Sequence, residues 1–398
     1  MSKRHNTILP GVRRHSALLQ AYEQGYTPVQ IKEAVRGTLS SEFKHPNMLD
    51  RYGIDLLTVE AVNIQRVRSK TWSSRLYDTC TQTRRGCLAN YQDLCARVCA
   101  LWLHPISDAL SLYWSAVRLE RSKGDLPLND FAYEIFRNIG ALIEGTLQIY
   151  LKEMLHIFDT AQGASTTFEQ IEELGLGSVV QRLEFQCGLS LSVPPWHIPL
   201  NQWRNIAQHF SLKADGTAIR CVYGSRRQHT VEFSRQELTE VAQALLLLHS
   251  TFRTSHTIFF LDEADALSAH CKPFPRDDSD LLFQFSVGAA SQGFEVTELD
   301  VRKERAAATL VDASDSEELS RAVHASQFGY QLWIATKADQ IEITYRSKHG
   351  RRTVKSSIGG EDCKKVFEGH EPLEYLAKVA VFTNQKHLAS RDIEPNDA

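Results

Sequence analysis

Residues 203–210, WRNIAQHF, place an arginine, an asparagine and a histidine close together among apolar side chains. At 3.6 residues per turn, the apolar residues of this stretch fall on one side of a helix and the polar residues on the other. Arg204, Asn205 and His209 therefore share a polar face, with Asn205 and His209 one turn apart. The stretch predicts an amphipathic helix that begins at or near Pro199.

This set of side chains suits the cleavage of RNA without a metal ion. A histidine can take the proton from a 2′-OH group or give one to the leaving 5′-oxygen. An arginine can hold the phosphate and stabilise the charge that develops on it. Arg204 and His209 point about 140° apart around the helix axis, so one helix does not close both on one phosphate. Two such helices, paired across a symmetric interface, would bring two arginines and two histidines together.

The flanking sequence predicts a helical domain around this motif. A 3.6-residue apolar period runs over residues 130–157 and carries Glu144 on an apolar background. Residues 217–223 and 229–233 predict a β-hairpin. A capping box at residues 167–170 begins a helix to Leu176, and another at residues 234–237 begins a long amphipathic helix to about Phe252.

Arg204-Asn205-Ile206-Ala207-Gln208-His209, together with this helical layout, resembles the HEPN-domain ribonucleases. The motif of that family is R-x4–6-H, with a polar residue, frequently Asn, directly after the arginine. The resemblance covers about residues 128–254. It implies a homodimer in which paired motifs form a metal-independent ribonuclease site, with no cofactor. It implies that Arg204, His209 and Asn205 are catalytic and that Glu144 and Gln208 support them. Glu144 either forms a salt bridge with Arg204 or lies on an exposed helix face, and the family layout favours the salt bridge.

The roles of this family suggest a biological function for the chain and two kinds of partner. Many members belong to toxin–antitoxin, abortive-infection and CRISPR-linked defence systems. We therefore expect an endoribonuclease that acts as a toxin or anti-phage effector on an RNA substrate, with an antitoxin or activator as a further partner. Arg226 and Arg227, at the tip of the hairpin, are candidate contacts for RNA phosphates or simply residues of a solvated turn.

Two alternatives stand beside the nuclease. The first is a catalytically silent HEPN-like module that binds a nucleotide, RNA or a partner protein. The second is a DNA-binding regulator, because residues 17–23 and a capping box at Thr27-Pro28-Val29-Gln30 resemble the start of a helix-turn-helix. An ordinary helical hairpin explains that stretch equally simply and is the favoured interpretation.

A third motif, residues 257–267 (TIFFLDEADAL), looks like a Walker B strand. Such a strand works only with a phosphate-binding loop, and the chain contains no G-x-x-x-x-G-K-[ST]. The stretch is therefore interpreted as an element at a domain junction, with Asp262 and Glu263 as surface or capping residues.

Composition limits the class of protein. The formal net charge of -3 provides no overall attraction to nucleic acid or membrane, so any RNA binding has to be local. The N-terminus has no apolar signal core and no apolar run is long enough for a membrane span, which predicts a cytoplasmic protein with no membrane partner. Four cysteines at 80, 87, 95 and 99 would form one stripe on a continuous helix, too long for one zinc ion, and are expected in the core rather than at a metal site.

The predicted fold is mainly α with a smaller α+β part. Residues 1–125 form a helical N-terminal region, and residues 126–255 form a central HEPN-like helical bundle with a β-hairpin insertion. Residues 275–385 form a C-terminal, ferredoxin-like α+β domain, in which 283–287 is expected to be a strand and 371–381 a helix. Residues 386–398 are expected to form a disordered tail.

Overall fold

The computed structural model describes residues 17–51, 53–118, 126–224, 227–272, 278–314 and 319–384. Contacts group the chain into two compact units. The helical unit is residues 36–274, and the sheet unit combines the residues before 36 with those after 274. The sequence predicts a boundary near residue 125, whereas the described residues on both sides of it belong to one unit. The predicted tail, residues 386–398, lies outside the described residues.

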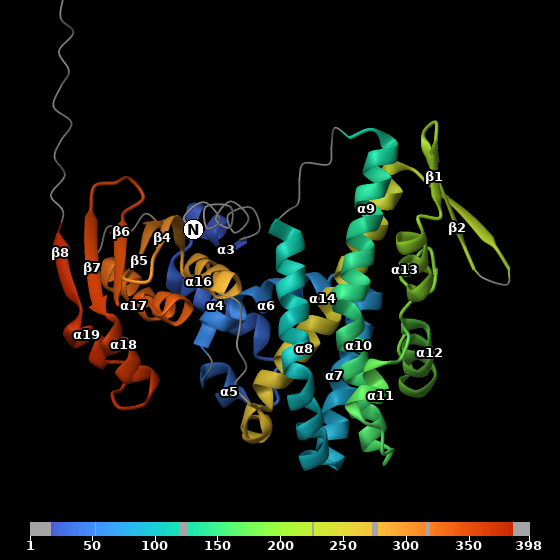
Figure 1. Cartoon of the computed structure of the whole chain (residues 1–398), viewed down its shortest axis with the longest axis horizontal. Helices are drawn as coiled ribbons and strands as arrows, with labels where there is room; N and C mark the ends of the chain where they lie inside the picture. The colour runs from blue at the N-terminus through green and yellow to red at the C-terminus, as the bar shows by residue number, and fades with distance from the viewer. Residues whose placement is uncertain are drawn as a thin grey trace, which may run out of the picture. The chain divides into compact units, whose positions relative to one another are not determined.

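The prediction of a mainly helical chain with a smaller part that contains strands is confirmed (Figure 1). Within the described ranges, no helix is both long and apolar enough to cross a membrane. The helical unit contains α5 (Pro46–Arg51), α6 (Gly53–Arg68), α7 (Thr71–Asn90), α8 (Gln92–Arg118), α9 (Leu128–Leu142), the π-helical turn η1 (Ile143–Leu147), α10 (Gln148–Ala161), α11 (Phe168–Glu172), α12 (Leu176–Cys187), α13 (Leu200–His209), β1 (Leu212–Asp215), β2 (Ala218–Tyr223), β3 (His229–Phe233), α14 (Arg235–Asp262), α15 (Ala264–Leu267) and the short η2 (Ser268–His270).

The long apolar period forms one run of helix, α9–η1–α10, in the middle of the helical unit (Figure 1). Its apolar residues are buried along the whole run, among them Phe136, Ile143 and Leu151, none of which is exposed. The helix is interrupted only by the π turn at residues 143–147. The predicted hairpin is also present, and β1, which the sequence did not suggest, extends it to an antiparallel sheet of order β1-β2-β3.

Local helix-start signals were predictable because they depend on neighbouring residues. At three helix starts the N-cap side chain accepts from the backbone N–H three residues later, and the side chain at that position accepts from the N-cap N–H. These predicted capping boxes pair Thr27 with Gln30, Thr167 with Gln170, and Ser234 with Glu237.

The end of α14 corrects one prediction. The stretch that resembles a Walker B strand is helical, because α14 continues to Asp262 instead of ending near Phe252. Asp262 was expected to be a surface or capping residue, yet it is buried. Its carboxylate accepts the backbone N–H groups of Lys44 at 2.9 Å and His45 at 2.8 Å, and it pairs with Arg85 at 2.6 Å.

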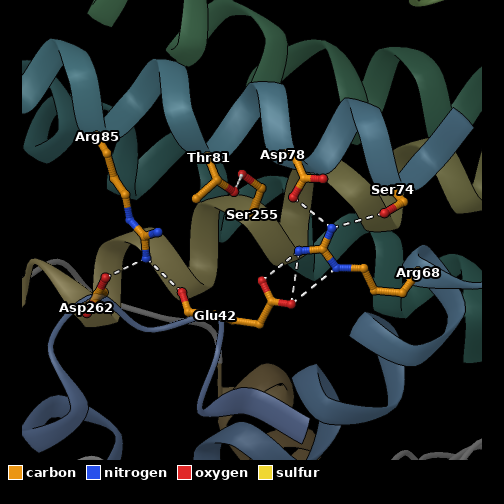
Figure 2. A network of polar contacts seen from close by, with 8 residues as sticks. All are labelled: Glu42, Arg68, Ser74, Asp78, Thr81, Arg85, Ser255 and Asp262. Carbon is orange, nitrogen blue, oxygen red and sulfur yellow. Dashed lines mark hydrogen bonds and ion pairs between the residues drawn. The ribbon is translucent and has the colours of Figure 1, made fainter. Parts of the chain in front are cut away.

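Figure 2 shows how charged groups hold the loop that precedes α5. Arg85 donates both to Asp262 and to the carbonyl of Glu42, at 2.7 Å. Arg68 donates to the carboxylate of Glu42 at 2.9 Å and to Asp78 at 2.7 Å. Since these side chains come from α6, α7 and α14, the loop is fixed to three helices at once.

A second set of charges is sealed inside the helical unit. The side chains of Arg84 on α7 and Glu153 on α10 are fully buried and lie 2.8 Å apart, from Nη2 to Oε2. His256 on α14 contacts the other oxygen of Glu153 at 3.0 Å. Burial alone would raise the pKa of Glu153, but Arg84 and His256 outweigh it and lower this pKa to about 2. Glu153 is therefore held as a carboxylate between α7 and α14.

The prediction that the four cysteines lie on one continuous helix is wrong, although they are buried as expected. A single helix was assumed over residues 80–99, but the helix breaks at Tyr91, between α7 and α8. Cys80, Cys87, Cys95 and Cys99 are all buried in one hydrophobic core. Burial raises the pKa of the Cys80 thiol to about 12. The four side chains serve as apolar packing, as expected.

The sheet unit is a five-stranded mixed sheet of order β4-β5-β6-β7-β8 with helices packed against it. Only β5 and β6 run parallel, and α17 connects them. Its elements are α3 (Ala17–Glu23), the first part of α4 (Pro28–Leu39), α16 (Asp278–Ser291), β4 (Phe294–Val301), β5 (Arg305–Asp312), α17 (Leu319–Thr336), β6 (Gln340–Arg346), β7 (Thr353–Gly359), α18 (Gly360–Phe367), α19 (Tyr375–Val379) and β8 (Val381–Asn384).

Several predictions for this unit differ from the structure. Residues 283–287, predicted as a strand, lie in the middle of α16, because a short apolar run does not distinguish a strand from a buried helix. The predicted helix over 371–381 is confined to α19, and residue 381 begins β8. The parallel strands β5 and β6 are direct neighbours, whereas a ferredoxin-like sheet splits such a pair with another strand, so the likeness does not extend to the strand order.

Replacing Glu153 by glutamine should strongly destabilise the helical unit. The change leaves the Arg84 guanidinium buried without an opposite charge, so we expect the free energy of unfolding to fall by about 3–5 kcal/mol. Urea denaturation followed by circular dichroism measures this. Asp108→Asn removes an exposed i,i+4 partner of His104 and should change the free energy by less than about 0.5 kcal/mol. Equal effects of the two variants would contradict the buried pair.

The same carboxylate should make the protein acid-sensitive. Because the pKa of Glu153 is lowered on folding, its contribution is complete above the pKa of the unfolded chain and is lost as the pH falls through the folded pKa of about 2. We expect a loss on the order of 3 kcal/mol between about pH 5 and pH 2. Urea titrations at several pH values test this, and the slope against pH should be smaller in Glu153→Gln.

Candidate active site

The predicted motif helix is α13, which spans Leu200–His209 with Pro199 as its N-cap residue. Its apolar face is buried in the main core of the helical unit, and Trp203 and Ile206 have no exposed surface. Arg204 and Asn205 are half-buried, and His209 is exposed. The sequence therefore predicted the orientation of this helix correctly.

Glu144 is the centre of the polar contacts on α13. Its two carboxylate oxygens accept from the Nε of Arg204 and from the side-chain amide of Gln208. Arg204 also donates to the Oδ1 of Asn205 at 3.3 Å. The side chains of Arg204 and Glu144 are 33% and 34% exposed, so the pair borders solvent instead of lying in the core. The expected salt bridge between Glu144 and Arg204 is confirmed.

The position of Glu144 depends on the π turn and on a close approach of two helices. Glu144 is the second residue of η1, the only irregular segment in the α9–η1–α10 run, and π turns of this kind are frequent at functional sites. One turn before it, Gly140 faces α13 so closely that a Cβ there would lie 3.3 Å from the Cβ of Ala207. A larger side chain at residue 140 would push α13 away from Glu144.

His209 is the last residue of α13. Its side chain forms no hydrogen bond or ion pair with any residue in the described ranges, Arg204 included. The structure thus brings together Arg204, Asn205, Gln208 and Glu144 and leaves His209 apart, as their directions on the helix require. Of the predicted catalytic side chains in one chain, Arg204 is therefore oriented by Glu144, whereas His209 is exposed to solvent.

Phe210 directly follows the histidine and was not singled out from the sequence. It is the C-cap residue of α13 in the left-handed conformation, with φ 46° and ψ 41°. This backbone costs a residue with a side chain about 1 kcal/mol, which is why helices commonly use glycine there. Its ring stacks on Tyr133 of α9, with ring centroids 4.9 Å apart and planes 11° apart.

A cleft of about 460 Å³ lies between α9, η1 and α13. Its polar lining is Glu144, Gln208 and Arg137, and aromatic and small residues line the remainder, including Phe136, Gly140 and Phe210. Arg204 and His209 are not among its lining residues. The sequence predicted the two faces of α13. The cleft was not predictable, because it depends on the packing of α9 against α13.

The turn between β2 and β3 is attached to the motif helix. The backbone N–H of Gly224 donates to the side chain of Gln202 on α13 at 3.0 Å. Of the two arginines predicted to contact RNA, Arg227 is exposed, and Arg226 lies outside the described residues. The turn that carries Arg227 is therefore hydrogen-bonded to the helix that carries the motif.

Comparison of the chain with family models, with curated proteins and with solved structures finds no match.

Removing Glu144 should reveal how strongly it holds Arg204. A double-mutant cycle with Glu144→Ala and Arg204→Ala should give a coupling free energy of about 0.5–1 kcal/mol, because the pair is only partly buried. Urea denaturation of the four proteins measures it. The exposed pair Arg220–Glu232 on the hairpin is a matched control, for which we expect a smaller coupling. A coupling of zero for the first pair would mean that it does not form in solution.

Proposed function

We propose that the chain is a metal-independent endoribonuclease of the HEPN type. The observation that carries the proposal is the division of labour on α13. Arg204 is oriented by Glu144, and His209 is exposed and unpaired among the described residues. An oriented cation and an open imidazole on the same helix suit phosphoryl chemistry better than structural support, which would have used both side chains internally.

The proposed reaction transfers one proton at each end of the scissile phosphate. An imidazole of His209 takes the proton from the 2′-OH, and the 2′-oxygen attacks phosphorus. The bond to the 5′-oxygen breaks, and this oxygen takes a proton from a second imidazole. The products are a 2′,3′-cyclic phosphate and a 5′-OH end. Arg204 stabilises the charge on the phosphate, and Asn205, Gln208 and Glu144 keep it in place.

The reaction needs a second copy of the chain. Arg204 and His209 point in different directions on one helix, so the second imidazole is proposed to be His209 of the partner subunit. A two-fold interface along the polar face of α13 would place two copies of both residues around one phosphate. In this proposal the HEPN-like bundle is built from α9–η1–α10, α13 and α14, with β1–β3 as its insertion.

The biological role proposed with this chemistry is that of a toxin or anti-phage effector. A nuclease that cuts cellular RNA has to be controlled, so an antitoxin or an activator is part of the proposal. The parts of the chain outside the HEPN-like bundle, including the sheet unit, are the candidates for receiving that control.

A second candidate function is a silent module that binds a nucleotide or RNA without cleaving it. The cleft beside Glu144 favours it, because Arg204 and His209 do not line this cleft. Binding without turnover would then use the cleft alone.

Cleavage of mixed cellular RNA in the presence of EDTA tests the nuclease. We expect the wild type to produce fragments with 2′,3′-cyclic phosphate ends. His209→Ala should slow cleavage about 10²- to 10⁴-fold, the usual contribution of a general acid or base. Arg204→Ala should slow it about 10²- to 10³-fold, as loss of one group that stabilises developing charge does.

Two exposed residues of α8 provide matched controls for these variants. His104→Ala and Arg97→Ala remove the same side-chain types from a surface away from α13 and should cleave as the wild type does. If the wild type is folded and dimeric but cuts no RNA, or if the His209 variant cuts normally, the proposed chemistry is wrong.

A further inference from the structure

Phe210 carries a large aromatic side chain at a position where the backbone favours glycine. Helix ends in the left-handed conformation favour glycine, which would adopt φ 46° without strain. A strained backbone that persists next to a candidate catalytic residue points to a function for that side chain. Core packing does not account for this side chain, because 44% of Phe210 is exposed.

The ring is nevertheless held in a defined orientation. Tyr133, itself 48% exposed, stacks on one face of Phe210 with nearly parallel planes. The remainder of the Phe210 ring lines the cleft. Two large aromatic side chains are thus fixed against each other at the surface, one residue after His209, and this is the arrangement that unstacked bases use in RNA-binding proteins.

The polar lining of the cleft distinguishes among ligand groups. Glu144 brings a carboxylate, which accepts hydrogen bonds, and Arg137, which pairs with Glu134 at 2.5 Å, brings a guanidinium. Each carboxylate oxygen of Glu144 already accepts one bond, from Arg204 or Gln208, and a carboxylate oxygen can accept a second. A neutral base with an amino group fits this surface, whereas uracil lacks such a group.

We propose that Phe210, backed by Tyr133, is a stacking platform for one base of single-stranded RNA, and that Glu144 in the adjoining cleft accepts a hydrogen bond from the amino group of that base. The subsite lies beside His209, so the base belongs to a nucleotide next to the scissile phosphate. This inference rests on the proposed function for the location of the phosphate. The geometry of the subsite itself does not depend on whether cleavage occurs.

Binding of 2′-O-methyl oligonucleotides to the full-length protein tests the subsite separately from cleavage. These probes have no free 2′-OH and cannot be cut by the proposed reaction. Fluorescence anisotropy should show tighter binding of 2′-O-methyl oligocytidine than of oligouridine, which differs from it in the amino group. His209→Ala should bind both probes as the wild type does.

The decisive variant is Phe210→Gly, which removes the ring and also relieves the left-handed backbone, so it should fold. We expect it to bind oligocytidine about 5- to 100-fold more weakly. Phe210→Trp should retain binding, because it restores a ring of similar shape. Phe185→Ala, which removes an 89% exposed phenylalanine from α12, is the matched control and should have no effect.

Four results would overturn the proposal. The first is that the wild type binds neither probe. The second is that Phe210→Gly binds oligocytidine as tightly as the wild type does. Equal affinity for oligocytidine and oligouridine would remove the assigned role of Glu144. A change from dimer to monomer in Phe210→Gly, measured by sedimentation, would show that the ring pair is a contact between copies. Loss of cleavage in His209→Ala with normal probe binding supports both the platform and the nuclease, whereas normal cleavage there rejects only the nuclease.

Discussion

The buried contact between Arg84 and Glu153 is the constraint on which the helical unit depends. A carboxylate with no exposed surface is tolerated only if groups from other elements pair with it, and here Arg84 on α7 and His256 on α14 do so. The position of α10 is therefore fixed relative to both helices. Since α10 continues through the π turn into α9, the same constraint sets the position of Glu144 and, through it, of Arg204 on α13. A charge in the core and a charge at the surface are thus linked by one run of helix.

Features that depend on near neighbours could be predicted from the sequence. The three capping boxes, the start of α13 at Pro199 and its two faces follow from spacing alone. The pairing of Glu144 with Arg204 was also expected, although only because of the resemblance to a family. Phe210 was missed because nothing in its neighbours reveals a left-handed backbone, and Tyr133, its partner, lies 77 positions earlier.

Features that depend on distant parts of the chain could not be predicted. Asp262 is buried because the backbone of residues 44 and 45 and Arg85 meet it, more than 170 positions away. In the sheet unit, Tyr22 lies so close to Gly293 that a Cβ there would come within 2.8 Å of its ring. The guanidinium of Arg321 also lies over the Tyr22 ring, at 6.0 Å from its centroid. No periodicity connects residue 22 with residues 293 and 321, so α3 was assigned to the wrong neighbours.

The split of the sheet unit between the two ends of the sequence gives it a fixed order of synthesis. The helical unit, residues 36–274, has been synthesised when the 124 residues from 275 to 398 are still to be added. At about 5–20 residues per second, these residues take roughly 6–25 s. During this interval α13 and Glu144 have already been synthesised. The strands of the sheet unit, to which α3 belongs, have not. The strands of the sheet unit are therefore synthesised after the helix that carries the motif.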